Sequence, residues 1–220
     1  RAFEETISLL EPAAKIKWHF EDGDKVLNKQ NLCTIQGDLV QVLKAERVAL
    51  NFLMHLSGIA TLTGLFVEKA AKHGTKILDT RKTTPGFRVA EKWAVKIGGG
   101  ENHRFALYDM IMLKDNHIDF AGGITLAIAK TKAYLKENNL DLKIIVEARD
   151  LEEIKEILES EGIHRILIDN LDFEDTKKAV ALIGDKCQTE SSGNINENTI
   201  RSYADCGVNF ISSGALTHSI

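Results

Sequence analysis

The sequence predicts an α/β fold built of repeated strand–helix units, and two observations carry that prediction. Short apolar runs that end in a polar residue recur from residue 76 onward, and helical stretches follow them. The end residues Glu147, Asp169, Glu190 and Ser213 are spaced by 22, 21 and 23 residues, which is the repeat of a βα unit in a parallel sheet. No GxGxxG motif follows the first strand, which favours a barrel over a doubly wound, dinucleotide-binding sheet.

The first 44 residues predict one helix and a small sheet. The helix covers residues 2–10, and its apolar face has no obvious partner in the sequence, so we expect further residues to precede it. Strands are predicted at residues 16–20, 34–36 and 40–43, separated by glycine- and aspartate-containing turns.

A long apolar segment follows, from Ala45 to about Lys72. Apolar residues fall on nearly every face, which predicts a buried helix or a pair of helices. Gly58 and Gly64 argue against one straight helix. Arg47 stands out because its near neighbours are apolar.

The barrel elements follow from the same pattern. Strands are predicted at residues 76–79, 110–114, 143–147, 165–169, 187–190 and 209–213, and helices at 151–160, 173–183 and 197–206. In a βα barrel, the residues at the carboxyl ends of the strands face the active site.

Composition excludes several classes of protein. The net charge of −4, from 28 basic and 32 acidic residues, argues against a nucleic-acid partner. The apolar runs fall short of the ~20 residues of a membrane span, so no membrane partner is expected. The three scattered cysteines form no CxxC pair, which predicts free thiols in a reducing compartment and a cytoplasmic protein.

Three clusters of cations lie at or near the predicted strand ends. They are Arg81-Lys82 in a loop closed by Pro85-Gly86, His103-Arg104 after three glycines, and Lys114 before Asp115-Asn116-His117. Guanidinium groups bind carboxylates or phosphates through two hydrogen bonds, and ammonium groups act as point charges. Together these side chains predict a pocket for a ligand with several negative charges. The alternative is that each is an ordinary surface charge.

The next strand ends carry carboxylates and then small residues. Glu147 and Asp169 predict a Mg²⁺ site, contacts to ribose hydroxyls, or a general acid–base pair. Ser191-Ser192-Gly193 and Ser212-Ser213-Gly214 expose backbone N–H groups, which predicts a phosphate site where barrels commonly have one. His218 fits that site or an ordinary structural role.

These motifs closely resemble one family, quinolinate phosphoribosyltransferase. The resemblance rests on TRKTTPG at residues 80–86, on GGG and NHR between 98 and 104, and on LKDNH at 113–117, and it extends from about residue 46 to 218. It implies transfer of phosphoribosyl from phosphoribosyl pyrophosphate to quinolinate with decarboxylation, which gives nicotinate mononucleotide, pyrophosphate and CO₂ for NAD synthesis. It also implies a requirement for Mg²⁺ and a homodimer or larger assembly with shared sites.

The resemblance further implies the architecture and the residue roles. An open, incomplete α/β barrel would span residues 46–220, and residues 1–45 would be part of a shortened N-terminal α/β sandwich domain. The quinolinate ligands would be Arg47, Arg81, His103, Arg104 and Lys114, with Arg47 reaching into a neighbouring subunit. The ligands of phosphoribosyl pyrophosphate would be Lys82, Lys114, Glu147, Asp169, Ser192, Gly193, Gly214 and His218. Lys82, Lys114, Glu147 and Asp169 would be catalytic, and Glu147 and Asp169 would bind the metal.

Two alternatives stay open on the sequence alone. One is a related phosphoribosyltransferase-like enzyme that uses another pyridine carboxylate, such as nicotinate, or the homologue found with molybdenum transport genes. The Lys114-Asp115-Asn116-His117 motif argues against the latter. The other is a non-catalytic, phosphate-binding barrel, against which the charged strand ends count.

Overall fold

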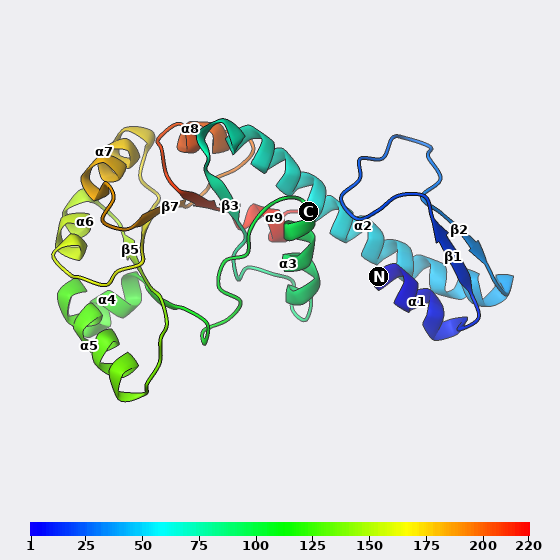
Figure 1. Cartoon of the computed structure of the whole chain (residues 1–220), viewed down its shortest axis with the longest axis horizontal. Coiled ribbons are helices and arrows are strands. Elements are labelled where there is room, and N and C mark those ends of the chain that lie inside the picture. The colour runs from blue at the N-terminus through cyan, green and yellow to red at the C-terminus, as the bar shows by residue number, and fades with distance from the viewer.

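The protein consists of a curved parallel sheet with covering helices and a smaller N-terminal part (Figure 1). The computed structural model describes residues 1–220, apart from the side chain of Lys72. The strands of the parallel sheet are β3 (Lys76–Leu78), β4 (Ile111–Leu113), β5 (Ile144–Ala148), β6 (Arg165–Asp169), β7 (Gln188–Ser192) and β8 (Phe210–Ser212).

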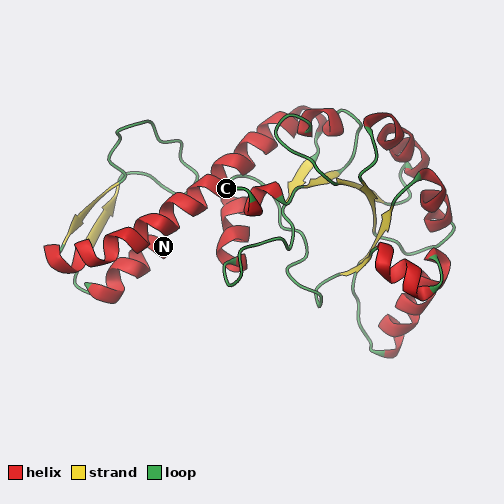
Figure 2. Ribbon diagram, turned by 180° about the vertical axis from the view of Figure 1, so that it is seen from behind, coloured by secondary structure: helices red, strands yellow, loops and turns green.

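The sheet is an open barrel. Its strand order is β3-β8-β7-β6-β5-β4, with every neighbouring pair parallel, so β3 and β4 are its two edges. Within the described backbone these two edges are not paired with each other. Figure 2 shows the strands forming a curved wall with helices along its outer side.

The predicted α/β fold with a parallel sheet is therefore confirmed, and each predicted barrel strand has a counterpart. The helices of the barrel are α3 (Arg88–Ile97), α4 (Asp115–Ala121), α5 (Ile124–Glu137), α6 (Leu151–Leu158), α7 (Phe173–Ile183), α8 (Ile200–Ala204) and α9 (Ala215–His218).

The N-terminal part is built on one long helix, α2 (Leu39–Ala70), which continues into the short 3-10 helix η1 (Ala71–His73). The helix α1 (Ala2–Leu10) and the antiparallel hairpin of β1 (Lys15–Trp18) and β2 (Cys33–Gln36) pack against its first half.

The expectation that the first helix lacks a partner is wrong. Phe3 and Ile7 on α1 are buried, and they pack against Ala45 and Ala49 on α2. Small residues on α2 let the two helices approach closely, so α1 finds its partner within this chain.

The prediction of a strand at residues 40–43 is also wrong, because α2 begins before it. Asp38 caps the helix, and its carboxylate accepts a hydrogen bond from the N–H of Gln41 at 3.0 Å. The helix then runs without a break through Gly58 and Gly64. Packing along its whole length outweighs the cost of two glycines.

α2 is long and strongly apolar. By length and composition alone it qualifies to cross a membrane, since its most apolar 18-residue window has a mean hydropathy of 1.5. Only 17% of that window is buried inside this chain. One such helix is weak evidence for a span, because a helix covered by another protein chain has the same composition.

Two apolar layers support the barrel. The main core lies between the outer face of the sheet and the helices, and includes residues such as Val146 and Ile168. The inner face carries a smaller cluster of Met112, Ile145 and Leu167 from β4, β5 and β6. Strand side chains alternate between the two layers, as expected for a sheet that is buried on both faces.

Candidate active site

The parallel strands bring several of the predicted site residues to one end of the barrel. Arg81 and Lys82 follow β3, Lys114 follows β4, Glu147 lies in β5, and Asp169 ends β6. Since the strands are parallel, their carboxyl ends meet at the same edge of the sheet, which is where βα barrels place their active sites.

Two arginines form the most cationic part of this end. Arg104 is only 6% exposed, and its Nη1 donates a hydrogen bond to the carbonyl of Met110 at 3.1 Å. Burial has the largest effect on the pKa of Arg104 and lowers it. The positive charge of Arg81 lowers this pKa further, and the negative charge of Asp109 partly opposes both effects. Two like charges held this close are stabilised by an anion that carries two negative groups.

His103 lies behind these arginines and faces the barrel interior. Its Nδ1 accepts a hydrogen bond from the N–H of Arg104 at 2.7 Å, which assigns the ring proton to Nε2. Nε2 lies 3.3 Å from a carboxylate oxygen of Glu190. His103 is only 9% exposed, so direct contact of its imidazole with a substrate carboxylate stays a prediction.

Lys114 and Glu147 form an ion pair at the mouth. The side chain of Lys114 is 44% exposed and that of Glu147 only 5%. Glu147 also lies 3.4 Å from the N–H of Asp115, at the start of α4. The carboxylate therefore holds the ammonium group in place while leaving it open to a ligand.

The loops after β7 and β8 supply the predicted phosphate side. Gly193 has φ of +97°, a conformation that favours glycine, and a Cβ there would collide with Asn170. A Cβ at Gly214 would lie 2.8 Å from His218 Nε2 and 3.0 Å from the side chain of Lys82. Gly214, His218 and Lys82 are thus neighbours.

A buried charge cluster lies beneath the mouth. Arg165 donates to Glu190 at 2.7 Å, and its guanidinium carbon lies 3.7 Å from the ring centroid of Phe210. Burial alone would raise the pKa of Glu190, but His103, Arg165 and Ser212 lower it to about 2. Glu190 is therefore an ionised group inside the barrel, facing His103 from below.

Comparison with known proteins assigns the family. The family model described as the N-terminal domain of quinolinate phosphoribosyl transferase matches residues 2–57, and the one described as its C-terminal domain matches residues 59–220. This chain belongs to the quinolinate phosphoribosyltransferase family.

Relatives from plants are similar over nearly the whole chain. A mitochondrial quinolinate phosphoribosyltransferase [decarboxylating] of Nicotiana glauca is 44% identical, and a chloroplastic nicotinate-nucleotide pyrophosphorylase [carboxylating] of Arabidopsis thaliana is 45% identical. Both alignments cover 96% of this chain and 64% of the relative. The chain thus spans somewhat less than two thirds of the length of these relatives.

Solved structures agree with the fold in detail. NadC from Streptococcus pyogenes superposes with a TM-score of 0.92 at 40% identity, covering 99% of this chain and 75% of that one. A nicotinate-nucleotide pyrophosphorylase from Francisella tularensis gives 0.92 over 98% of this chain and 75% of its own, also at 40% identity. The open barrel is therefore shared with these NadC structures.

Arg88 lies next to the predicted site residues, and the sequence alone indicates no role for it. Its guanidinium donates to Thr83 Oγ1 (3.1 Å), to the carbonyl of Arg81 (3.2 Å) and to the carbonyl of Phe105 (3.1 Å). It clamps the loop that carries Arg81 to the loop that carries Arg104. Nothing in the sequence distinguishes it from a solvated charge at the start of a helix.

Arg47 is the predicted ligand that this chain does not bring to its own barrel mouth. It lies exposed on α2, the helix that leads away from the barrel to the N-terminal part (Figure 1). None of the hydrogen bonds or ion pairs among the described side chains involves it.

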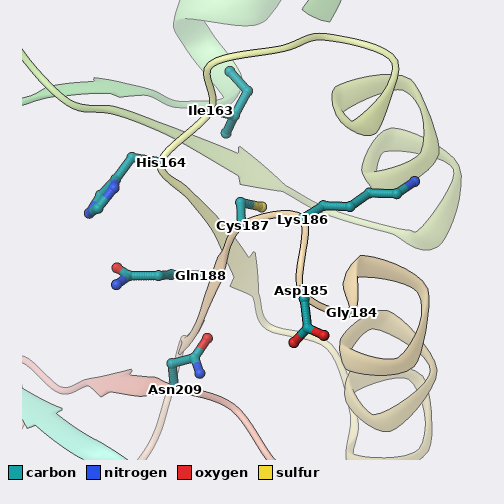
Figure 3. A pocket seen from close by; sticks show the side chains of 8 residues that line it. All are labelled: Ile163, His164, Gly184, Asp185, Lys186, Cys187, Gln188 and Asn209. Atoms are coloured by element: carbon teal, nitrogen blue, oxygen red, sulfur yellow. The ribbon is translucent and has the colours of Figure 1, made fainter.

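A hollow of about 390 Å³ lies at the opposite end of the barrel (Figure 3). His164, Gln188 and Asn209, which line it, stand at the amino ends of β6, β7 and β8. It is therefore separate from the predicted family site, at the end where barrel residues serve stability.

We predict that Glu190→Gln removes an acid-sensitive part of the stability. Because the pKa of Glu190 is about 2 in the folded protein and 4.5 as its ordinary value, its stabilising effect is complete above pH 4.5 and is lost as the pH falls toward 2. The free energy of unfolding of the wild type should therefore exceed that of the variant by about 2 kcal/mol less at pH 3 than at pH 7.

Urea unfolding at both pH values measures this difference. The exposed Glu174→Gln variant on α7 is the control and should track the wild type throughout. A gap between wild type and Glu190→Gln that stays constant with pH would show that Glu190 is not an ionised, charge-paired group.

Proposed function

We propose that this chain carries the catalytic barrel of a quinolinate phosphoribosyltransferase. The reaction joins the ring nitrogen of quinolinate to C1 of the ribose of phosphoribosyl pyrophosphate and ends in nicotinate mononucleotide, pyrophosphate and CO₂. The observation that carries the proposal is the pairing of Arg81 with the buried Arg104 at a barrel mouth that also holds Lys82 and Lys114.

The arginine pair fits a substrate with two adjacent carboxylates. Each guanidinium presents a planar set of donors that matches a carboxylate, and the close approach of Arg81 and Arg104 needs more than one negative charge in return. Nicotinate has a single carboxylate. Quinolinate has two, so the pair favours quinolinate over a nicotinate-type substrate.

The chemistry asks the protein mainly for positioning and charge. The lone pair of the ring nitrogen forms the bond to C1, and the bond from C1 to the pyrophosphate oxygen breaks with its electron pair leaving on pyrophosphate. Lys82 and Lys114 are placed to stabilise that departing charge. Glu147, buried beside Lys114, is the proposed group that stabilises the positive charge developing on the ribose.

Decarboxylation follows from the product of that step. The new pyridinium withdraws electrons, so the bond from the ring to the adjacent carboxylate breaks, CO₂ leaves, and a proton replaces it on the ring carbon. Arg81 and Arg104 hold the ring in one orientation throughout. No protein nucleophile is required.

Glu147 and Asp169 are the proposed ligands of Mg²⁺. They project from the adjacent strands β5 and β6, while the described residues contain no group of three or more His, Cys, Asp or Glu placed to hold a metal. Two carboxylates suit Mg²⁺, which keeps several waters and is otherwise held by substrate phosphates. When bound, Mg²⁺ neutralises charge on the leaving pyrophosphate.

A second copy of this chain is the proposed partner of α2. Val40, Leu43, Arg47 and Met54 follow one stripe of the helix, and the apolar members are each 57% exposed. A second copy that covers this stripe would remove its apolar surface from water. Arg47 would then enter the barrel mouth of that second copy, and the resulting homodimer would have shared sites.

The cytoplasmic location stays a prediction that rests on the free thiols.

A coupled assay tests the function. The purified protein should form nicotinate mononucleotide from quinolinate and phosphoribosyl pyrophosphate with Mg²⁺ and lose that activity with a chelator. Quinolinate should also raise the melting temperature, and nicotinate should not. Product formed from nicotinate instead would identify a relative with a different substrate, and no product with either would indicate a non-catalytic barrel.

We predict that Arg104→Ala weakens quinolinate binding by roughly 100-fold, because a two-point guanidinium–carboxylate contact contributes about 3 kcal/mol. Binding of phosphoribosyl pyrophosphate should change by less than about threefold. Isothermal titration calorimetry measures both. Arg201→Ala, at an exposed position on α8, is the control. An unchanged affinity for quinolinate would disprove the site assignment.

We predict that Arg47→Ala is inactive alone but recovers activity when mixed with Arg104→Ala. In the mixed dimer one barrel receives an intact Arg47 and keeps its own Arg104. Random exchange then restores about a quarter of the wild-type activity, because half of the dimers are mixed and each has one complete site. Subunit exchange without recovered activity would rule out a shared site.

A further inference from the structure

Asp79 and Lys92 form an ion pair that is wholly inside the protein and that the proposed reaction does not use. Asp79 follows β3 and is 0% exposed, and Lys92 lies in the middle of α3 and is 2% exposed. Removing two charges from water is costly, and an apolar pair of similar volume is often as stable. A pair retained at such a position calls for an explanation beyond stability.

Its hydrogen bonds all lead to one short segment. Asp79 Oδ1 accepts from the N–H of His103 at 2.8 Å, and Lys92 Nζ donates to the carbonyl of the same residue at 3.1 Å. With its amide nitrogen facing the two acceptors, Asn102 donates to Asp79 Oδ2 and to the carbonyl of Lys92, both at 2.8 Å. The ion pair thus fixes the peptide groups on either side of His103.

That segment ends in Arg104. The N–H of Arg104 donates to the ring of His103, and its guanidinium is held by Met110. A shift of the His103 backbone would therefore move the arginine that faces the proposed substrate. Among the described side chains, no hydrogen bond or ion pair joins Asp79 or Lys92 to the Lys114–Glu147 pair.

We propose that the Asp79–Lys92 ion pair is a positioning device for quinolinate recognition, which presents Arg104 to a substrate carboxylate without touching the substrate. This inference rests on the proposed function. Because the hydrogen bonds of the pair lead to the segment that carries His103 and Arg104, its loss separates the two substrates: quinolinate affinity falls and affinity for phosphoribosyl pyrophosphate does not.

Lys92→Met and Asp79→Asn test the inference, since each keeps the side-chain volume and removes one charge. Each should weaken quinolinate binding at least tenfold, as measured by isothermal titration calorimetry, and change the affinity for phosphoribosyl pyrophosphate by less than threefold. The KM for quinolinate should rise by the same factor, while kcat at saturating quinolinate stays within threefold of the wild type.

Two further variants separate positioning from general instability. Thr75→Val removes a buried hydrogen bond to the carbonyl of Val208 at the other end of β3, and should lower the melting temperature without changing the ratio of the two affinities. Asn102→Ala removes one donor to Asp79 and leaves the ion pair intact. It should weaken quinolinate binding severalfold even if neither charge variant folds.

The outcomes are distinct from those for the function itself. If the wild type binds quinolinate and the folded variants bind it equally well, the positioning role is wrong and the function stands. Equal losses for both substrates would also overturn it, because they indicate a general loss of structure. A wild type that does not bind quinolinate would overturn the function and this inference together.

Discussion

The open edge between β3 and β4 is the constraint on which the site depends. An unpaired strand edge leaves backbone donors and acceptors without partners, and the chain covers the β3 edge with the segment after α3. Glu101 donates to the carbonyl of Ile77 at 2.8 Å and accepts from the N–H of Asp79 at 3.2 Å. The segment that pairs with the β3 edge also carries His103 and Arg104, so the same segment satisfies that edge and supplies part of the anion site.

This arrangement explains the glycines before that segment. A Cβ at Gly100 would lie 2.8 Å from Thr63 Cγ2 on α2 and 2.9 Å from Val95 Cγ1 on α3. The chain must therefore pass between two packed helices to reach the β3 edge, and only a residue without a side chain fits there. In the sequence these glycines are only a run that precedes His103 and Arg104. The structure adds close packing as the reason for Gly100.

The sequence was sufficient for features that depend on local pattern and insufficient for those that depend on packing. The strand–helix repeat predicts all the parallel strands, and the strand ends locate Lys114, Glu147 and Asp169 at one mouth. The predicted strand at residues 40–43 failed because the cap at Asp38 and packing against α1 decide that segment. The roles of Arg88, Lys92 and Arg165 could not be recognised, because only the tertiary structure shows that the last two are buried and which groups all three contact.

The barrel interior combines an apolar cluster with enclosed charges. β4, β5 and β6 contribute the apolar cluster of Met112, Ile145 and Leu167 to the interior. Toward β7 and β8, Glu190 is held by Arg165, and it lies beneath His103. Charged interiors cost stability unless every group is paired. The cluster of Arg165, Glu190 and His103 adjoins Arg104 through His103, which indicates that the cost is accepted where a cationic site must be held rigid.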